Sequence, residues 1–406
     1  MTRFATAAGN LARRQQRRFA SRVRWAVKVG EEGLRDGWHA IRRAQNAVRD
    51  QAVTLAKTML RRVRRPVRTV VRRKHQLQEQ WAFYASEWQI ERELEDLVRR
   101  DRPIVLGPWV SEVGFETLYW VPFLHWVKAA FRLDADRLIA VSRGGVGAWY
   151  EGLAGRYIEI WDHTAPAEFA RRNAERGVVK HFDRSPLDEA ILEQVARRLG
   201  TSDFDVIHPG LMYRLFTLYW SGQRAMGFVD AHTRFIRQRA APIIDPGLLP
   251  REYIAVKFYA ARSLPDTPAT RTFLRTAVSR LAEQLPVVLL DTGLVLEDDH
   301  GDYSFDGGGR IISARGWMTP QNNLGAQTQI VAGARAFVGT CGSIAWLAPR
   351  LGVDTSALFV DPQWLHAHLA VAMRAYHKLG AGRFAAADLR AFELLGTGLT
   401  SDVGIL

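Results

Sequence analysis

A run of small residues at positions 339–343 (Gly-Thr-Cys-Gly-Ser) has the pattern of an anion-binding turn. An apolar stretch at 336–339 predicts a strand, and a helical stretch begins near Ser343. A turn between a strand and a helix exposes backbone N–H groups at the positive end of the helix dipole, where a phosphate or diphosphate binds. Thr340, Gly342 and Ser343 are therefore candidate ligands. The alternative is a tight structural turn with Ser343 as its N-cap.

Four further polar residues are candidates for binding the same ligand. Asn322, Asn323 and Gln327 form a dense polar set that opens a predicted helix. Helix capping and a polar surface are their alternative roles. Lys257 lies near the end of a predicted strand at 253–259, at the start of the same half.

Two carboxylates follow the predicted strand at 103–106. Gly107 permits a bent loop there, so that Glu112 or Glu116 is placed to deprotonate a hydroxyl group. Apolar neighbours such as Trp109 would raise the pKa of either carboxyl group toward the range of a general base. Glu112 is the first choice because it lies in mid-loop, whereas Glu116 begins a predicted helix, where the dipole favours an acid. Capping and loop structure are the alternative roles of both.

A second glycine-rich loop, 142–147, follows the next predicted strand. Arg143 in this loop carries a guanidinium group that is suited to bind a phosphate or a carboxylate through two hydrogen bonds. Together with Gly107 and Trp109, it forms the predicted acceptor side of the site. The loop lacks the spacing of a dinucleotide-binding fingerprint, and the sequence contains no P-loop motif.

The elements that must position these residues alternate between strand and helix from residue 102 onward. Apolar runs predict two series of strands: 103–106, 137–141, 157–161 and 204–207, then 253–259, 287–291, 310–313, 336–339 and 356–360. Such alternation predicts parallel sheets with helices on both faces. The segment 241–251 contains three prolines and divides the two series. We therefore expect an α/β fold of two Rossmann-like doubly wound domains, 102–245 and 250–406, which face a cleft.

These segments resemble glycosyltransferases of the GT-B architecture, in particular bacterial enzymes of surface-polysaccharide assembly. The resemblance covers most of residues 102–380 and rests on YIAVKFY at 253–259, VVLLDTG at 287–293, NNLGAQTQIVAGARAFVGTCGSIAWLAPRLGV at 322–353 and GPWVSEVGFETLYWVPFL at 107–124. It implies that the C-terminal domain binds a nucleotide sugar, with the diphosphate near Thr340, Gly342 and Ser343. It also implies that the N-terminal domain binds the acceptor and that neither a catalytic metal nor a separate cofactor is required.

Residues 1–101 are predicted to be a basic, amphipathic helical arm. Residues 1–75 carry 21 Lys and Arg against 4 acidic residues, whereas the remaining 331 residues carry 35 basic and 38 acidic ones. A heptad-like apolar stripe from Leu34 to Met59 favours a coiled coil, hence a homo-oligomer, and the paired arginines suit an anionic membrane surface. A second helix, 76–100, is expected to pack on the body through Trp88, Leu94 and Leu97. Nucleic-acid binding, a transit peptide and a solvated extension are alternative roles of the arm.

Composition and motifs together favour a cytoplasmic protein that is peripheral to the inner face of the membrane. Cys341 is the only cysteine, which excludes an internal disulfide bond and fits a reducing compartment. No run approaches the ~18 apolar residues of a membrane span. The predicted function is transfer of a sugar from a nucleotide-sugar donor to a hydroxyl group of a lipid-linked or polysaccharide acceptor. A non-catalytic scaffold of the same fold, which recruits partners through the arm, and a nucleic-acid-associated protein are the alternatives.

Overall fold

The computed structural model describes residues 87–175, 181–294, 301–305, 309–363 and 365–391. Two compact units divide the chain, Met1–Trp81 and Ala82–Leu406, and every described residue belongs to the second. The predicted basic helix and its heptad stripe, within residues 1–75, lie outside the described residues. Across the described part of the chain, no helix has both the length and the apolar character to cross a membrane.

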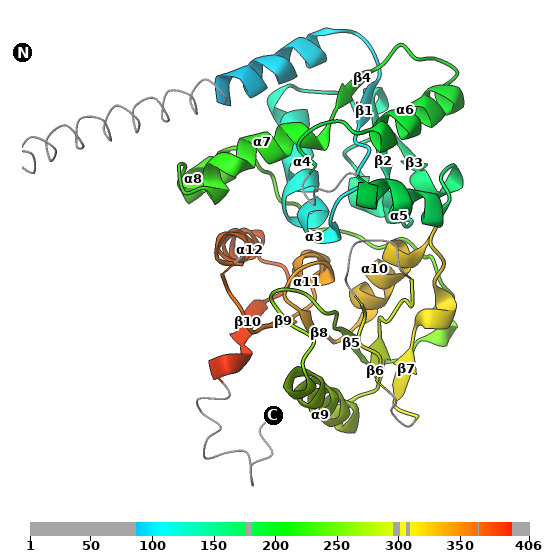
Figure 1. Ribbon diagram of the computed structural model, residues 1–406, viewed down its shortest axis with the longest axis vertical. Coiled ribbons are helices and arrows are strands. Elements are labelled where there is room, and N and C mark those ends of the chain that lie inside the picture. The colour runs from blue at the N-terminus through cyan, green and yellow to red at the C-terminus, as the bar shows by residue number, and fades with distance from the viewer. Residues whose placement is uncertain (1–86, 176–180, 295–300, 306–308, 364, 392–406) are drawn as a thin grey trace, which may run out of the picture. The chain divides into compact units, whose positions relative to one another are not determined.

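The first half of the second unit contains a four-stranded parallel sheet in the order β3-β2-β1-β4 (Figure 1). Its strands are β1 (Ile104–Leu106), β2 (Leu138–Ser142), β3 (Arg156–Glu159) and β4 (Asp205–Ile207). The helices of this half are α3 (Val113–Phe115), α4 (Val121–Ala130), α5 (Pro166–Glu175), α6 (Pro186–Leu199), α7 (Pro209–Trp220) and α8 (Met226–Ala231). A π-helical turn, Glu116–Trp120, joins α3 to α4.

The second half contains a six-stranded parallel sheet in the order β10-β9-β8-β5-β6-β7. Its strands are β5 (Ile254–Lys257), β6 (Val287–Leu289), β7 (Ile311–Ser313), β8 (Ala336–Thr340), β9 (Thr355–Phe359) and β10 (Phe384–Asp388). Its helices are α9 (Pro268–Gln284), α10 (Asn323–Gly333), α11 (Ile344–Leu347) and α12 (His366–Leu379). The expected α/β fold with two Rossmann-like parallel sheets is confirmed. Strand β10 and helices α7 and α8 were not expected from the sequence.

A helix at 87–99 packs on the first half through Leu94 and Leu97, as expected, but not through Trp88. Its buried residues are Ile90 and Leu94, which belong to the main apolar core, and Leu97 packs against that core. Trp88 is 56% exposed and carries the guanidinium of Arg92 over its ring. The expectation that Trp88 packs on the body is therefore wrong, because the buried stripe passes through the neighbouring helix positions.

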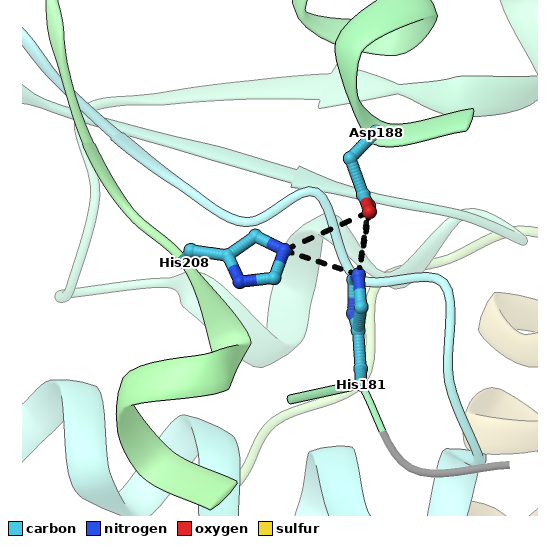
Figure 2. Close-up of side chains that lie close together, drawn as sticks. All are labelled: His181, Asp188 and His208. Atoms are coloured by element: carbon cyan, nitrogen blue, oxygen red, sulfur yellow. Dashed lines mark hydrogen bonds and ion pairs between the residues drawn. The ribbon is translucent and has the colours of Figure 1, made fainter. Parts of the chain in front are cut away.

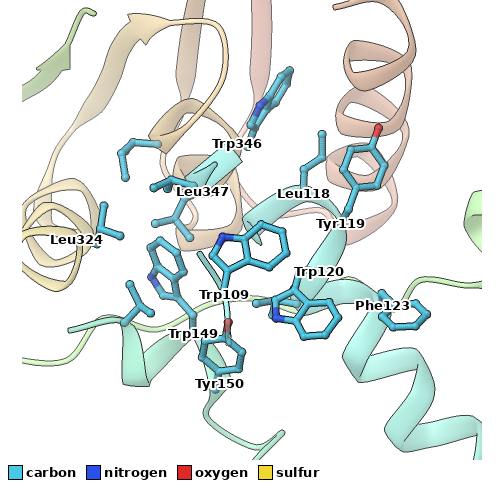
Figure 3. Close-up of a cluster of buried hydrophobic side chains, with 14 of the residues drawn as sticks. Trp109, Leu118, Tyr119, Trp120, Phe123, Trp149, Tyr150, Leu324, Trp346 and Leu347 are labelled. Atoms are coloured by element: carbon cyan, nitrogen blue, oxygen red, sulfur yellow. The ribbon is translucent and has the colours of Figure 1, made fainter. Parts of the chain in front are cut away.

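The apolar core is continuous between the two halves (Figure 3). Trp109, Trp120 and Trp149 enter it from the first half, and Leu324 and Trp346 enter it from the second. The three tryptophans of the first half are almost completely buried. Burial of large aromatic side chains is the main apolar contribution to the stability of such a junction.

Arg350 ties the two halves together from within this core. Its side chain is 1% exposed and donates hydrogen bonds to the carbonyl oxygens of Thr117 (2.7 Å) and Ile236 (3.3 Å) and to Oε1 of Gln238 (3.0 Å). The Gln238 amide in turn donates to the carbonyl oxygen of Ala148 (2.7 Å). Burial lowers the pKa of Arg350 to about 10, so the group still carries its charge at neutral pH.

Replacing the guanidinium should therefore destabilise the whole unit. We expect Arg350→Met, which keeps the apolar stem, to lower the free energy of unfolding by about 3 kcal/mol, because it leaves buried acceptors without donors. The control is Arg280→Met, which removes an exposed ion pair with Glu283 and should change stability by less than about 0.5 kcal/mol. Urea denaturation measures both. Equal stability of the two variants would contradict the bridging role of Arg350.

Candidate active site

The loops at the carboxyl ends of the two parallel sheets contact each other. Gly114, which follows β1, lies against the turn after β8: a Cβ atom at Gly114 would stand 3.0 Å from the backbone nitrogen of Ser343. The carbonyl oxygen of Gly144, which follows β2, accepts hydrogen bonds from the backbone N–H groups of Leu324 (2.9 Å) and Gly325 (2.8 Å) in α10. Ligands of parallel α/β sheets bind beyond these strand ends. The region between the loops is therefore the candidate active site.

The turn after β8 has an unusual backbone. Gly342 has a φ of 135°, and Ser343 has φ 42° and ψ −120°, a combination that costs a non-glycine residue about 1 to 3 kcal/mol. Within the part of the chain that the structure describes, the N–H groups of Gly342 and Ser343 donate to no protein acceptor. The Ser343 side chain makes no capping hydrogen bond to α11, so the structure does not bear out its alternative role as an N-cap.

Thr340 supports this turn through hydrogen bonds to the backbone of Tyr259. Its side chain is 1% exposed, and its hydroxyl group accepts a hydrogen bond from the backbone N–H of Tyr259 (2.9 Å) and donates one to the Tyr259 carbonyl (3.0 Å). The next residue, Cys341, is also buried. Thr340 thus joins the end of β8 to the end of β5. Its role as a ligand stays a prediction.

Glu112 and Tyr259 approach the turn from opposite halves. Glu112 is half-buried at the start of α3, and its side chain makes no capping hydrogen bond. Burial raises the pKa of Tyr259 well above its usual value, and the negative charge of Glu112 contributes to the increase. A Cβ atom at Gly342 would stand 2.6 Å from the Tyr259 hydroxyl oxygen. The Tyr259 hydroxyl group and the two N–H groups therefore lie close together, and Glu112 lies two residues before Gly114, which contacts Ser343.

Glu116, the second predicted base, lies in the interior of the first half. Its side chain is fully buried, and Oε1 accepts hydrogen bonds from the hydroxyl groups of Ser142 (2.6 Å) and Tyr150 (2.6 Å). Burial raises the pKa of Glu116 to about 7, although the nearby charge of Arg143 and the two hydrogen bonds oppose the increase. The arrangement suits a buried group that holds the loops in place rather than one that touches a ligand.

The three residues predicted to bind the acceptor are also buried. Arg143 is 2% exposed, and its guanidinium donates to the carbonyl oxygens of Trp109 (3.2 Å) and Ser111 (2.7 Å). The Trp109 indole is completely buried and stacks on Trp120. Gly107 has a φ of 126°, and a Cβ atom there would collide with the backbone of β2. Arg143 therefore shapes the loop that carries Glu112, and acceptor binding by these residues stays a prediction.

The predicted donor-binding residues form internal hydrogen bonds at the same edge. The Lys257 ammonium group donates to Asp302 (3.0 Å) and to the carbonyl oxygen of Leu290 (3.0 Å). Asn322 Oδ1 accepts from the backbone N–H of Thr319 (2.7 Å). The buried Asn323 and Gln327 side chains donate to carbonyl oxygens in and before the first turn of α10. Their contacts with a ligand stay predictions, and the charge of Lys257 already has a partner.

The sequence analysis did not assign a role to Tyr259 or to Glu159. Glu159 accepts hydrogen bonds from the backbone N–H groups of Gly144 (2.9 Å) and Gly145 (2.8 Å), and so fixes the loop that caps α10. The sequence signal for Glu159 was an acidic residue within the otherwise apolar predicted strand 157–161, which follows the glycine-rich loop 142–147. Tyr259 was visible as the polar end of the predicted strand 253–259.

Comparisons with known proteins find distant structural similarity only. A glycosyl transferase of family 9 from Veillonella parvula covers 75% of this chain and 90% of its own, at 12% identity and a TM-score of 0.39. The ADP-heptose lipopolysaccharide heptosyltransferase II of E. coli covers 65% and 87%, at 12% identity and a TM-score of 0.34. A putative UDP-N-acetylglucosamine 2-epimerase from Listeria monocytogenes covers 74% and 89%, at 12% identity and a TM-score of 0.32.

Sequence comparisons find no match. No protein-family model matches the chain, and no curated protein sequence does. Structural similarity at this distance does not assign an activity, so the function must be argued from the geometry.

The raised pKa of Glu116 predicts a pH-dependent stability. Because the folded-state pKa of about 7 exceeds the ordinary 4.5, folding favours the protonated carboxyl group. This contribution is complete below pH 4.5 and is lost as the pH rises through 7. Glu116→Gln keeps a hydrogen-bond acceptor without the charge. We expect its free energy of unfolding, relative to wild type, to increase by about 2 kcal/mol between pH 5 and pH 8.

Urea denaturation at several pH values measures this difference. The exposed Glu151→Gln serves as the control that removes a surface carboxylate. A difference between Glu116→Gln and wild type that stays constant from pH 5 to pH 8 would show that Glu116 does not titrate in this range.

Proposed function

We propose that the protein is a glycosyltransferase that moves a sugar from a nucleotide-sugar donor to a hydroxyl group of an acceptor. The observation that carries the proposal is the pair of N–H groups at Gly342 and Ser343, which donate to no protein acceptor in the described residues. They lie against Gly114, which has no Cβ atom and follows Glu112 by two residues. A diphosphate is a ligand of the right charge and hydrogen-bonding character for them.

The proposed role of the turn is to stabilise the leaving group. When the bond between the sugar and the diphosphate breaks, negative charge develops on the diphosphate oxygen. Fixed N–H groups need no reorganisation to stabilise that charge, and the strained backbone at Ser343 holds them in place. Lys257 lies one strand away, but Asp302 already neutralises its charge. The N–H groups would therefore contribute more to stabilising the leaving group, and Lys257 less, than expected from the sequence.

The proposed general base is Glu112. It comes from the first half, it is half-buried, and it lies two residues before Gly114, which contacts the turn of the second half. A carboxylate in that position would accept the proton of an acceptor hydroxyl as the hydroxyl attacks the sugar. Arg143 and Glu116 would position the loop through the hydrogen bonds described above. A lipid-linked or polysaccharide acceptor, and docking of residues 1–75 on an anionic membrane, complete the proposal and rest on the sequence alone.

The first test is nucleotide binding. We expect the full-length protein to bind at least one of UDP, GDP, dTDP, CDP or ADP in calorimetric titrations. Gly114→Ala should weaken that binding at least tenfold, because the added methyl group would stand 3.0 Å from the Ser343 nitrogen and 3.1 Å from the Trp346 ring. Gly227→Ala, in α8 with no atom within 4 Å of the added carbon, is the matched control. Failure of every nucleotide to bind would favour the non-catalytic scaffold.

The second test concerns the proposed base. Glu112→Gln should lower the rate of sugar transfer by at least about a hundredfold, the usual contribution of a general base, while the affinity for the nucleotide stays within about threefold of wild type. A transfer assay with the nucleotide sugar identified by binding, together with titration of the product nucleotide, separates the two effects. Full transfer activity in Glu112→Gln would remove this residue from the mechanism.

A further inference from the structure

Three buried side chains from separate segments of the first half converge on one point (Figure 2). His181 lies in the connection before α6, Asp188 lies in the first turn of α6, and His208 precedes α7. His181 and Asp188 are completely buried, and His208 is 7% exposed. The group lies outside the candidate active site, and none of its members has a role in the proposed reaction.

The three polar atoms are very close to one another. Nε2 of His181 lies 2.8 Å from Oδ2 of Asp188 and 3.0 Å from Nε2 of His208, and the remaining side of the triangle measures 3.8 Å. A point equidistant from the three corners of this triangle lies about 2 Å from each, which is the bond length of first-row transition metals to imidazole nitrogen and carboxylate oxygen. The three atoms are therefore close enough to bind one such ion, and the closest pair, 2.8 Å apart, would separate to the roughly 3.3 Å between ligand atoms of a tetrahedral site.

No placement of protons on the two neutral histidine rings turns all of these contacts into hydrogen bonds. Nδ1 of His208 accepts a hydrogen bond from the backbone N–H of Gly210 (3.1 Å), so a neutral His208 carries its proton on Nε2. If His181 accepts that proton, its Nε2 lone pair faces the Asp188 carboxylate. If His181 instead donates to Asp188, two N–H groups face each other across 3.0 Å. Each arrangement leaves one repulsive contact in a region where water has no access.

We propose that His181, Asp188 and His208 bind one divalent transition-metal ion, with Zn²⁺ the best fit to two imidazoles and a carboxylate. Nε2 of each histidine and a carboxylate oxygen of Asp188 are the ligand atoms. Oδ2 of Asp188 also accepts hydrogen bonds from the backbone N–H and the hydroxyl group of Ser185 (2.6 Å each), which hold the carboxylate in place. The ion would form one bond to each of the three residues and compensate the buried carboxylate. Because the site is buried, the ion has a structural role, in that it joins α6 to the start of α7 independently of the proposed transferase reaction.

One contact must change when the metal binds. A neutral, metal-bound His208 carries its proton on Nδ1, which would then face the Gly210 N–H across 3.1 Å, so the hydrogen bond that caps α7 is lost and these two groups must move apart. This bond has a separate role that a substitution can preserve. Asn is among the best N-cap residues and its side-chain oxygen can accept from Gly210, but it lacks the ligating nitrogen. His208→Asn therefore removes the metal ligand and keeps the cap.

The experiment uses the full-length protein and Zn²⁺ as the probe. Wild type, His208→Asn and Thr267→Ala are purified, unfolded with a chelator, refolded with or without one equivalent of Zn²⁺, and desalted. Metal content is then measured by plasma mass spectrometry. Thr267→Ala is the matched control, because it removes the N-cap of another helix, α9, and leaves the three ligand atoms and their partners unchanged. His163→Gln, which removes an exposed histidine, controls for adventitious surface binding.

We expect about one Zn²⁺ per chain in wild type and in both controls, and less than a tenth of that in His208→Asn. The melting temperature of wild type should rise by about 5 °C with Zn²⁺, and that of His208→Asn should not change. Wild type that refolds without metal uptake and without a shift in melting temperature would overturn the proposal. Equal metal content in His208→Asn would overturn it as well. If His208→Asn fails to fold, the metal content and melting temperature of wild type still decide.

Discussion

The buried guanidinium of Arg350 constrains the arrangement of the two halves more than any other polar group described here. A buried charge is tolerated only when its N–H groups are hydrogen-bonded, and Arg350 meets this requirement with carbonyl and amide oxygens rather than with a carboxylate. One of those oxygens belongs to Thr117, directly after α3. The same contact therefore holds Gly114 and Glu112 at a fixed distance from the turn after β8. The candidate active site depends on this constraint.

Most of the polar side chains at the strand ends are occupied in shaping loops. Arg143 bonds to the carbonyl oxygens of one loop, Glu159 to the N–H groups of another, and Lys257 to Asp302. Among the described residues, the backbone N–H groups of Gly342 and Ser343 donate to no protein acceptor. The proposed site would therefore bind through main-chain geometry, so that its specificity would depend on loop shape more than on the identity of the polar residues.

The strands and the fold class could be predicted from the sequence because buried parallel strands are short, uninterrupted apolar runs. Strand β10 was missed because Phe384–Asp388 is a half-buried edge strand of mostly alanine, which has no such pattern. Helix α7 was missed although Pro209 and a capping His208 mark its start. Lys257 and Thr340 end their strands and Arg143 directly follows one, as the sequence indicated, and the roles of these residues stay predictions. Their burial and their partners, such as Asp302 for Lys257, arise from contacts between distant segments, which spacing along the chain does not reveal.

The indole rings at the junction also bear on how the molecule folds and evolves. A break at the proline-rich segment 241–251 would uncover Trp149 and Trp346, because Trp149 donates a hydrogen bond to Thr328 of the second half (3.0 Å) and Trp346 lies against Gly114 of the first. Exchange of one half for that of another protein would therefore demand matched aromatic surfaces at the junction.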